Sequence, residues 1–424
     1  MARFENQAPP GRFGRGVAVR AAKRFASLSI LLIASFGATG CWDRTELNEL
    51  AITSATAIDW EDGKWSISYQ VVIPSAISKT MSVTGGGASK LPIIVYSTQG
   101  KTIREAVGRS TLESPRHLFF SHTRVVVISD VVARQGLSPL LDVYFRNPDS
   151  RETVSVLIAK GNARKILEQL MQLQIIPGDG IEETLRNEAE EFSALPNVRI
   201  YDLALSIVSP SRSAIVPEIL ISGKEEVSSA DALSKTSLSS KLRLGRLAVF
   251  NGDRMAGWMS REEALGAAFI RNRIKTTTIP FACEKDKAKI DSAFKLAESA
   301  TQLTPKKDGD GFTMRIEVQG EGQLMETDCT KDLNEPSVAR QLEGQLEREI
   351  TDRIENAWQA ARKMNIDVVG FADAIHRKYP KEWKRMKKDW PAFLAKIQIE
   401  PSVHVTIKRM GLTNRSFKTL TEKD

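Results

Sequence analysis

One apolar run stands apart near the start of the chain. It covers residues 25–36 and follows a polar, basic stretch. Twelve helical residues rise about 18 Å, well short of a hydrocarbon core about 30 Å thick. A basic segment, a short apolar run and then small residues form the order of a secretory signal, which we predict over residues 1–40. No later stretch reaches about eighteen apolar residues, so we expect the remainder to be a soluble ectodomain.

The first half of this ectodomain mixes two hydrophobic periods. Alternation and β-branched runs predict strands over 50–60, 64–73, 92–98, 125–129 and 153–159. Helical periodicity predicts helices from Thr102 onward and over 130–145, 162–171 and 180–192. The Asp62-Gly63 pair predicts a tight hairpin, and the glycine-rich segment 75–90 predicts a loop that lacks the spacing of a phosphate-binding loop. Strands alternating with helices indicate an α/β fold of the mixed α+β kind.

The second half follows a Ser- and Lys-rich segment, 221–243, which predicts a boundary. Strands are predicted over 244–250 and 255–259 around an Asn-Gly-Asp turn, near 275–283 and 311–318, and over 401–408. A long helix opens at Pro336, and its apolar stripe includes Leu346, Ile350 and Trp358. We expect the stripe to cover its own sheet rather than a partner helix, and to share one core with Trp258.

These patterns divide the chain of 424 residues, which is long enough for two or three ordinary domains. The predicted parts are a signal peptide over 1–40, an N-terminal α/β region with two subdomains over 41–222, a linker over 223–243, a C-terminal α/β domain over 244–416 and a tail over 417–424.

The apolar run is followed by the small residues Gly37 to Gly40 and then by Cys41, which is the pattern of a lipoprotein signal-peptidase site. Cleavage there would make Cys41 the new N-terminus and its sulfur the carrier of a diacylglyceryl group. One acyl chain holds a protein only marginally, whereas two chains anchor it stably. We therefore predict lipidation at Cys41 and a lipid anchor on the outer face of a membrane. An uncleaved anchor helix is the alternative, and it leaves the protein on the same side.

The net charge and the remaining cysteines limit the possible partners and cross-links of the chain. Lys and Arg exceed Asp and Glu by 60 to 52, a net +8, of which residues 1–40 contribute six basic groups and one acidic group, or +5. The remaining +3 gives no argument for a nucleic-acid partner. Beyond Cys41 only Cys283 and Cys329 occur. In an exported protein they either form a disulfide or stay as two thiols, at least one of them buried, and both alternatives stay open.

The sequence contains no recognisable motif of a catalytic, cofactor-binding or metal-binding site. None of the four histidines, His117, His122, His376 and His404, has a second ligand at metal-binding spacing, and G-x-S-x-G and G-x-G-x-x-G are absent. We expect no enzyme, no cofactor and no metal site. The basic cluster 377–388 interleaves with Trp383, Met386 and Trp390. It either touches anionic lipid headgroups or, the reading we favour, is the solvated side of a helix whose aromatic residues reach the core.

Several short segments, none specific alone, occur in an order that resembles the Ger(x)C family of spore germination lipoproteins. They are Cys41-Trp42-Asp43, Glu46-Leu47-Asn48, Ala57-Ile58-Asp59, 115–119 with Ser121-His122, 141–151, 159–163, 245–250, 257–259, 263–266, 367–371, Tyr379-Pro380, Trp383 and Trp390. The likeness thus spans nearly the whole chain after residue 40.

The resemblance implies a three-domain ectodomain of mixed sheets and helices and the role of the C subunit of a nutrient germinant receptor in the inner spore membrane. Its implied partners are a polytopic A-type subunit, a transporter-like B-type subunit and the bilayer that holds the anchor. The family carries no catalytic residues, and its one functional position maps onto Cys41.

Two other functions compete with this one. A tethered solute-binding lipoprotein of a transporter usually has two similar lobes, and this chain shows no internal repeat. An enzyme of the cell envelope is disfavoured because no catalytic motif is present.

Overall fold

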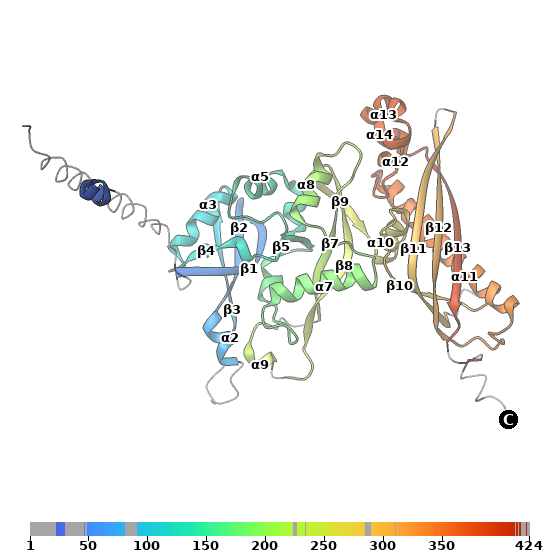
Figure 1. The fold of residues 1–424 in the computed structure, drawn as a ribbon, viewed down its shortest axis with the longest axis horizontal. Helices are drawn as coiled ribbons and strands as arrows, with labels where there is room; N and C mark the ends of the chain where they lie inside the picture. Colours follow the sequence, from blue (N-terminus) through green and yellow to red (C-terminus); the bar gives the residue numbers. More distant parts are fainter. Residues whose placement is uncertain are drawn as a thin grey trace, which may run out of the picture. The chain divides into compact units, whose positions relative to one another are not determined.

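The computed structural model describes residues 23–29, 46, 49–80, 91–223, 227–233, 235–284, 290–309, 311–411, 413, 415–416 and 421. The chain divides into two compact units, Met1–Leu50 and Ala51–Asp424. In the first unit, residues 23–29 are helical. The second unit holds two mixed sheets and the helices around them, so the predicted mixed α/β class is confirmed (Figure 1).

Within the described residues, the larger sheet has nine strands in the order β3-β2-β1-β5-β6-β7-β8-β9, with β4 beside β1. The strands are β1 (Leu50–Glu61), β2 (Lys64–Val72), β3 (Ile93–Gly100), β4 (His117–Phe119), β5 (Val125–Ser129), β6 (Ser155–Ala159), β7 (Ile215–Gly223), β8 (Ser240–Asn251) and β9 (Arg254–Met259). The central strands β1, β5, β6 and β7 run parallel, and antiparallel strands flank them, β2 and β3 on one side and β8 and β9 on the other. Every residue of β5 and β6 is buried, as expected for strands covered on both faces.

Both predicted hairpins form, because their turn residues adopt the backbone that such turns need. Glu61 pairs with Lys64, which leaves Asp62 and Gly63 as the turn, with φ of 49° and 74°. Positive φ at both positions is the signature of the two-residue turn that matches strand twist. In the second hairpin Asn251 pairs with Arg254 across Gly252, and β8 and β9 are the strands predicted there.

The helices of the second unit that precede the smaller sheet range from 4 residues in α9 to 15 in α7. They are α2 (Pro74–Thr80), α3 (Ile103–Arg109), α4 (Asp130–Gln135), α5 (Ser138–Arg146), α6 (Arg164–Glu168), α7 (Pro177–Glu191), α8 (Ile200–Val208), α9 (Ala230–Leu233) and α10 (Arg261–Ile270). The single helix predicted over 130–145 is wrong, since Gly136 adopts a φ of 129° and separates α4 from α5. The loop predicted over 75–90 begins instead with helix α2, and its residues 81–90 lie outside the described part of the chain.

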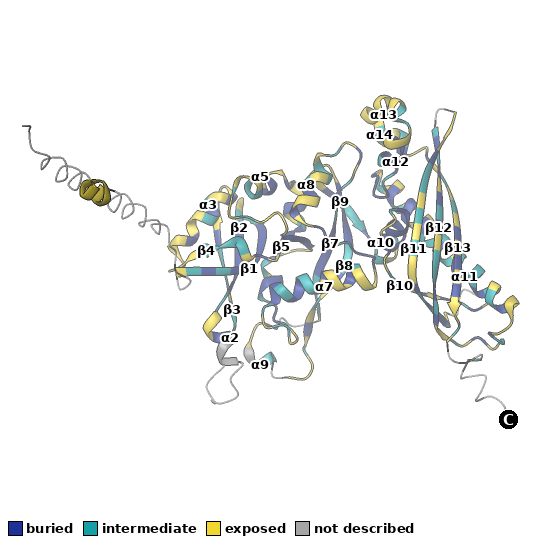
Figure 2. Cartoon of the chain, viewed as in Figure 1, coloured by how far each residue is buried: buried dark blue, intermediate teal, exposed yellow. Residues whose placement is uncertain are grey.

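The second sheet has four strands in the described residues: β10 (Thr277–Phe281), β11 (Ser292–Asp308), β12 (Gly311–Thr327) and β13 (Gln398–Arg409). Between β12 and β13 the chain forms the helices α11 (Pro336–Met364), α12 (Phe371–Lys378), α13 (Pro380–Met386) and α14 (Trp390–Leu394). The long helix predicted from Pro336 is confirmed, and its apolar stripe is buried against β10 and β13 as expected. In Figure 2 the same helix alternates between buried and exposed surface along its length.

The Ser- and Lys-rich segment does not mark the boundary between the two sheets. Strand β7 ends at Gly223, and Gly223 pairs with Ser240, the first residue of β8. The residues between them therefore connect two neighbouring strands of the nine-stranded sheet. The division of the chain into regions at 223–243 stays a prediction, and the topology adds that β8 and β9 belong to the larger sheet.

The expectation that Trp258 shares a core with the long helix is wrong. Leu346, Ile350 and Trp358 lie in the core cluster that includes the smaller sheet. Trp258 packs against a different cluster, on the other face of the larger sheet, while its neighbour Met259 joins the cluster of the helix. Consecutive strand residues point to opposite faces, so only one of these two side chains can face the helix.

Candidate functional site

The predicted lipidation site, Cys41, lies outside the residues that the structure describes. Among the described residues, no helix combines the length and the apolar character needed to cross a bilayer. No group of three or more His, Cys, Asp and Glu side chains is arranged to hold a metal ion in that same part of the chain. The structure does pair Cys283 with Cys329 in a disulfide, with Cα atoms 5.7 Å apart and both residues buried.

Segments that carry the family resemblance and lie far apart in the chain contact each other in the structure. The first contact is made by Asp59. Its carboxylate, at the end of β1, accepts hydrogen bonds from the backbone N–H groups of Ala163 (2.8 Å) and Arg164 (3.1 Å). Burial raises the pKa of Asp59 to about 6, although these two N–H groups act in the opposite direction. The Ala-Ile-Asp segment and the segment 159–163 are therefore held together by one buried carboxyl group.

A second meeting point joins β7, β8 and β9. The Glu218 side chain is 2% exposed, and its carboxylate accepts three hydrogen bonds from Arg246, at 2.6, 2.9 and 2.9 Å. The Arg246 guanidinium also lies 4.4 Å from the centroid of the Trp258 ring, within the range of a cation–π contact. Gly245 leaves room for this arrangement, because a Cβ atom there would collide with the Glu218 carboxylate.

The sequence pointed to Arg246 only as part of a resembling segment and to Trp258 as part of another and of the expected core of the long helix, and it did not point to Glu218. The signal was present, since Glu218 is the one charged residue of the otherwise apolar run 215–221. A charge in such a run is costly to bury unless it is paired. Burial acts to raise the pKa of Glu218, but the hydrogen bonds from Arg246 outweigh it and hold that pKa below its usual value.

Two further segments position helices. The buried Asp367 carboxylate accepts hydrogen bonds from the backbone of Gly370 (2.8 Å), Phe371 (3.0 Å) and Ala372 (2.6 Å) and so caps the start of α12. Burial raises the pKa of Asp367 despite these bonds. Gly266 lets α10 approach α11, since a Cβ atom there would overlap the carbonyl group of Arg353. These residues support the fold rather than reaction chemistry.

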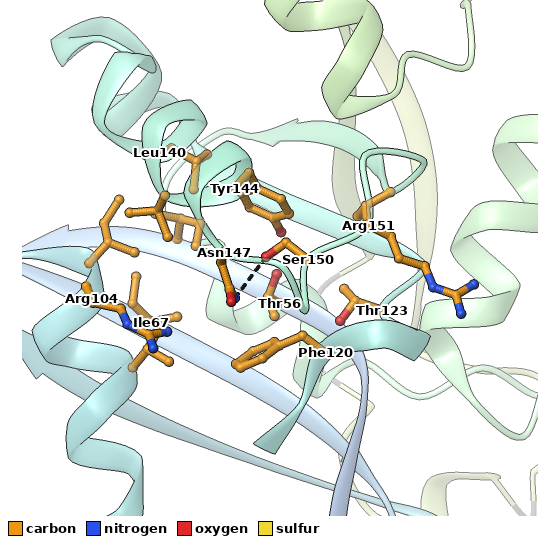
Figure 3. A pocket seen from close by; sticks show the side chains of 15 residues that line it. Thr56, Ile67, Arg104, Phe120, Thr123, Leu140, Tyr144, Asn147, Ser150 and Arg151 are labelled. Carbon is orange, nitrogen blue, oxygen red and sulfur yellow. Dashed lines mark hydrogen bonds between the residues drawn. The ribbon is translucent and has the colours of Figure 1, made fainter. Parts of the chain in front are cut away.

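A small pocket lies where two other resembling segments approach each other. Phe120, which lies between the two parts of the segment 115–119 with Ser121-His122, lines it with Asn147 and Ser150 of the segment 141–151. Thr56 and Tyr144 complete this part of the lining. Figure 3 shows the Tyr144, Ser150 and Thr56 hydroxyl groups converging there, and Asn147 donates a hydrogen bond of 3.1 Å to Ser150. Burial raises the pKa of Tyr144 to about 12. At about 50 Å³ the cavity has room for a few water molecules and not for a metabolite.

In the basic cluster of the C-terminal region, the predicted packing of the aromatic residues on the core is confirmed, but the predicted single helix is divided into α12, α13 and α14. Trp383 and Met386 are buried, and Trp390 is half-buried against the same core. Lys381, Lys384 and their neighbours Lys387 and Lys388 are exposed. The aromatic residues thus fix short helices to the core, with the lysine side chains in solvent.

Comparison with known proteins identifies both halves of the chain. Residues 43–221 match the family model described as the spore germination protein N-terminal domain. Residues 245–411 match the model described as spore germination B3/GerAC like, C-terminal.

Individual relatives span almost the full length. Spore germination protein KC of Bacillus subtilis (strain 168) is 28% identical over 395 residues, which cover 92% of this chain and 96% of that protein. Spore germination protein B3 of the same organism is 20% identical over 94% of this chain and all of the relative. The crystal structure of the GerBC protein has a similar fold, with a TM-score of 0.52 and 15% identity over 83% of this chain and 96% of that one.

Proposed function

Because the chain belongs to the GerAC-like family of spore germination proteins, we propose that it is the lipid-anchored, non-enzymatic C subunit of a nutrient germinant receptor. The observation that carries the proposal is the coverage of both halves by family models in the family order, with relatives that match more than nine-tenths of the chain. The buried carboxylates of Asp59, Glu218 and Asp367 support the non-enzymatic part of the proposal, because each one holds structural elements together.

The proposed arrangement comprises a signal peptide over 1–40, a three-domain ectodomain and partners of the A and B types in the membrane. The ectodomain would act by contact with these subunits, on the outer face of the spore inner membrane. Diacylglyceryl on Cys41 would keep it there, since each buried CH₂ group contributes about 0.8 kcal/mol and two chains act together.

Replacing Cys41 with Ala is expected to abolish lipid attachment and to move the protein from the membrane to the soluble fraction or to a wrong location. The physical reason is that no second anchor of comparable strength replaces the two chains. Fractionation followed by mass spectrometry of the mature N-terminus measures the effect. Thr39→Ser, which keeps a small residue before the cysteine, serves as the control and should behave as the parent does. Membrane-bound protein with an unmodified Cys41 would contradict the prediction.

Deletion of the gene tests the receptor role directly. Spores of the deletion strain should form normally, respond poorly to one class of nutrients and still germinate by non-nutrient routes, because one input to germination is lost. A panel of amino acids, sugars and nucleosides, applied in a strain without paralogous receptors, measures the response. Re-introduction of the parental gene restores the lost response. Unchanged responses to every nutrient would overturn the proposal and favour the solute-binding alternative.

A further inference from the structure

A large cleft of the second unit is unrelated to the small pocket of Figure 3. Its volume is about 760 Å³, and its walls come from the segment between α7 and α8, the end of α10, strand β11 and the start of α12. Ile215, Leu247 and Leu303 supply part of an apolar wall. Sites for small molecules typically measure about 300–1,000 Å³ and combine apolar walls with a few polar groups. The dimensions therefore fit a metabolite.

Positive charge dominates the lining. Its charged residues are five cations, Arg212, Arg271, Arg273, Lys275 and Arg377, and two acids, Asp202 and Asp373. Both acids are already engaged. The Asp373 carboxylate lies 2.8 Å from Arg377 and 3.8 Å from Arg212, and the Asp202 carboxylate accepts a hydrogen bond from the backbone of Arg199.

Three cations lie at the end of α10: Arg273 and Lys275 are exposed, and Arg271 lies within the electrostatic influence of the Asp367 and Asp373 carboxylates. Among the described residues, no ion pair links Arg271, Arg273 or Lys275 to a carboxylate. Arg271 is half-buried and donates a hydrogen bond of 3.2 Å to the backbone carbonyl of Val368. Burial, with Arg273 next in effect, lowers the pKa of its guanidinium. A desolvated cation of this kind is stabilised by any anion that reaches it.

A neutral group in the same lining is also unpartnered. The Thr301 hydroxyl is buried, and within the described ranges it makes no hydrogen bond. The backbone N–H of Thr301 is held by the Asn272 side chain at 2.9 Å, which fixes this residue beside the end of α10. Cations and apolar walls thus face one space, and the unpartnered Thr301 hydroxyl is buried within its lining.

We propose that this cleft binds a small organic anion with carboxylate or phosphate oxygens, held by Arg271, Arg273 and Lys275 and packed by its carbon skeleton against Ile215 and Leu303. The site goes beyond the receptor-subunit role and does not depend on it. A small molecule fits better than an acidic peptide segment, because the volume is that of a metabolite pocket and apolar walls accompany the charges.

Titration calorimetry on the full chain in detergent tests the site, with citrate and inorganic phosphate as probes at constant ionic strength. Saturable binding is expected for at least one of them, and none for glucose. The double variant Arg273→Gln/Lys275→Gln should weaken binding by about tenfold or more, since charge-assisted hydrogen bonds are lost. The matched double variant Lys384→Gln/Lys387→Gln removes equal charge from exposed positions outside the cleft and should bind as the parent does.

Three results would overturn the proposal. The first is the absence of saturable binding by either probe, and the second is an equal loss in the cleft and control variants. The third is binding of polyglutamate, titrated in the same way, without binding of citrate or phosphate, which would make the cleft a peptide surface. The melting temperature of each variant without anion reports folding. If the double cleft variant does not fold, Arg273→Gln and Lys275→Gln are each measured alone, and unchanged affinity in both would equally refute the site.

Discussion

Replacing Arg246 with Met is expected to lower the free energy of unfolding by about 2–4 kcal/mol. Removing one partner of a buried pair costs about 3–5 kcal/mol, and the value expected here is somewhat smaller because water reaches Arg246. The Arg246 side chain is 39% exposed, whereas that of Glu218 is 2% exposed. The variant leaves the Glu218 carboxylate buried without its three hydrogen bonds. Urea unfolding followed by tryptophan fluorescence measures the loss.

The pH dependence of this loss separates a charge effect from a packing effect. In the parent the pKa of Glu218 is lowered, so the stability that this group contributes is present above its unfolded pKa and is lost as pH falls. In the variant, burial without Arg246 raises that pKa, so stability is lost as pH rises. The gap between the two proteins should therefore be largest near neutral pH and shrink toward pH values of about 4.

Arg146→Met is the matched control, because Arg146 also donates two hydrogen bonds to a carboxylate, that of Asp142, but both side chains are largely exposed. We expect little change in stability from this substitution. A loss in Arg246→Met that stayed the same at every pH would show that Arg246 contributes by packing on Trp258 alone.

Replacing Ile350 with Ala is expected to cost about 2–5 kcal/mol, the range for truncation of a large aliphatic side chain in a close-packed core. Ile350 is 0% exposed and lies in the middle of the α11 stripe, in the cluster that includes the smaller sheet. Its loss would leave a cavity that two rigid elements, a helix and a sheet, cannot readily close.

Gln359→Ala, at an exposed position of the same helix, controls for helix propensity and should change stability by less than about 0.5 kcal/mol. Equilibrium unfolding in urea compares the two variants. An Ile350→Ala loss under about half a kcal/mol would contradict the packing of α11 on its sheet.

Local chemistry was sufficient to predict part of the fold. The turn at Asp62 and Gly63 follows from residues that tolerate positive φ, and β5 follows from a continuous β-branched run. The stripe of α11 follows from three- and four-residue spacing. Each of these signals lies within a few neighbouring residues, which is why no tertiary information was needed.

Other elements gave little signal. Strand β11 spans Ser292–Asp308, yet its second half is largely exposed and carries small and polar residues, so its sequence lacks the alternation of a half-buried strand. Its pairing with β12, from Ser292 with Thr327 to Asp308 with Gly311, supplies the backbone hydrogen bonds that compensate. The conformation of such a segment is therefore set by its pairing with the neighbouring strand and not by its own sequence.

By itself the sequence determined the mixed fold class, the two hairpins, the long helix and the family resemblance, and it nominated Cys41. Only the tertiary structure decided that Glu218 meets Arg246 and that Trp258 faces away from α11. Only the tertiary structure brought Arg271, Arg273 and Lys275 into one cleft with Thr301. The reason is physical. Periodicity reports which face of an element is apolar, whereas the partner of a charge and the contents of a cleft depend on strand register and on packing between residues far apart in the chain.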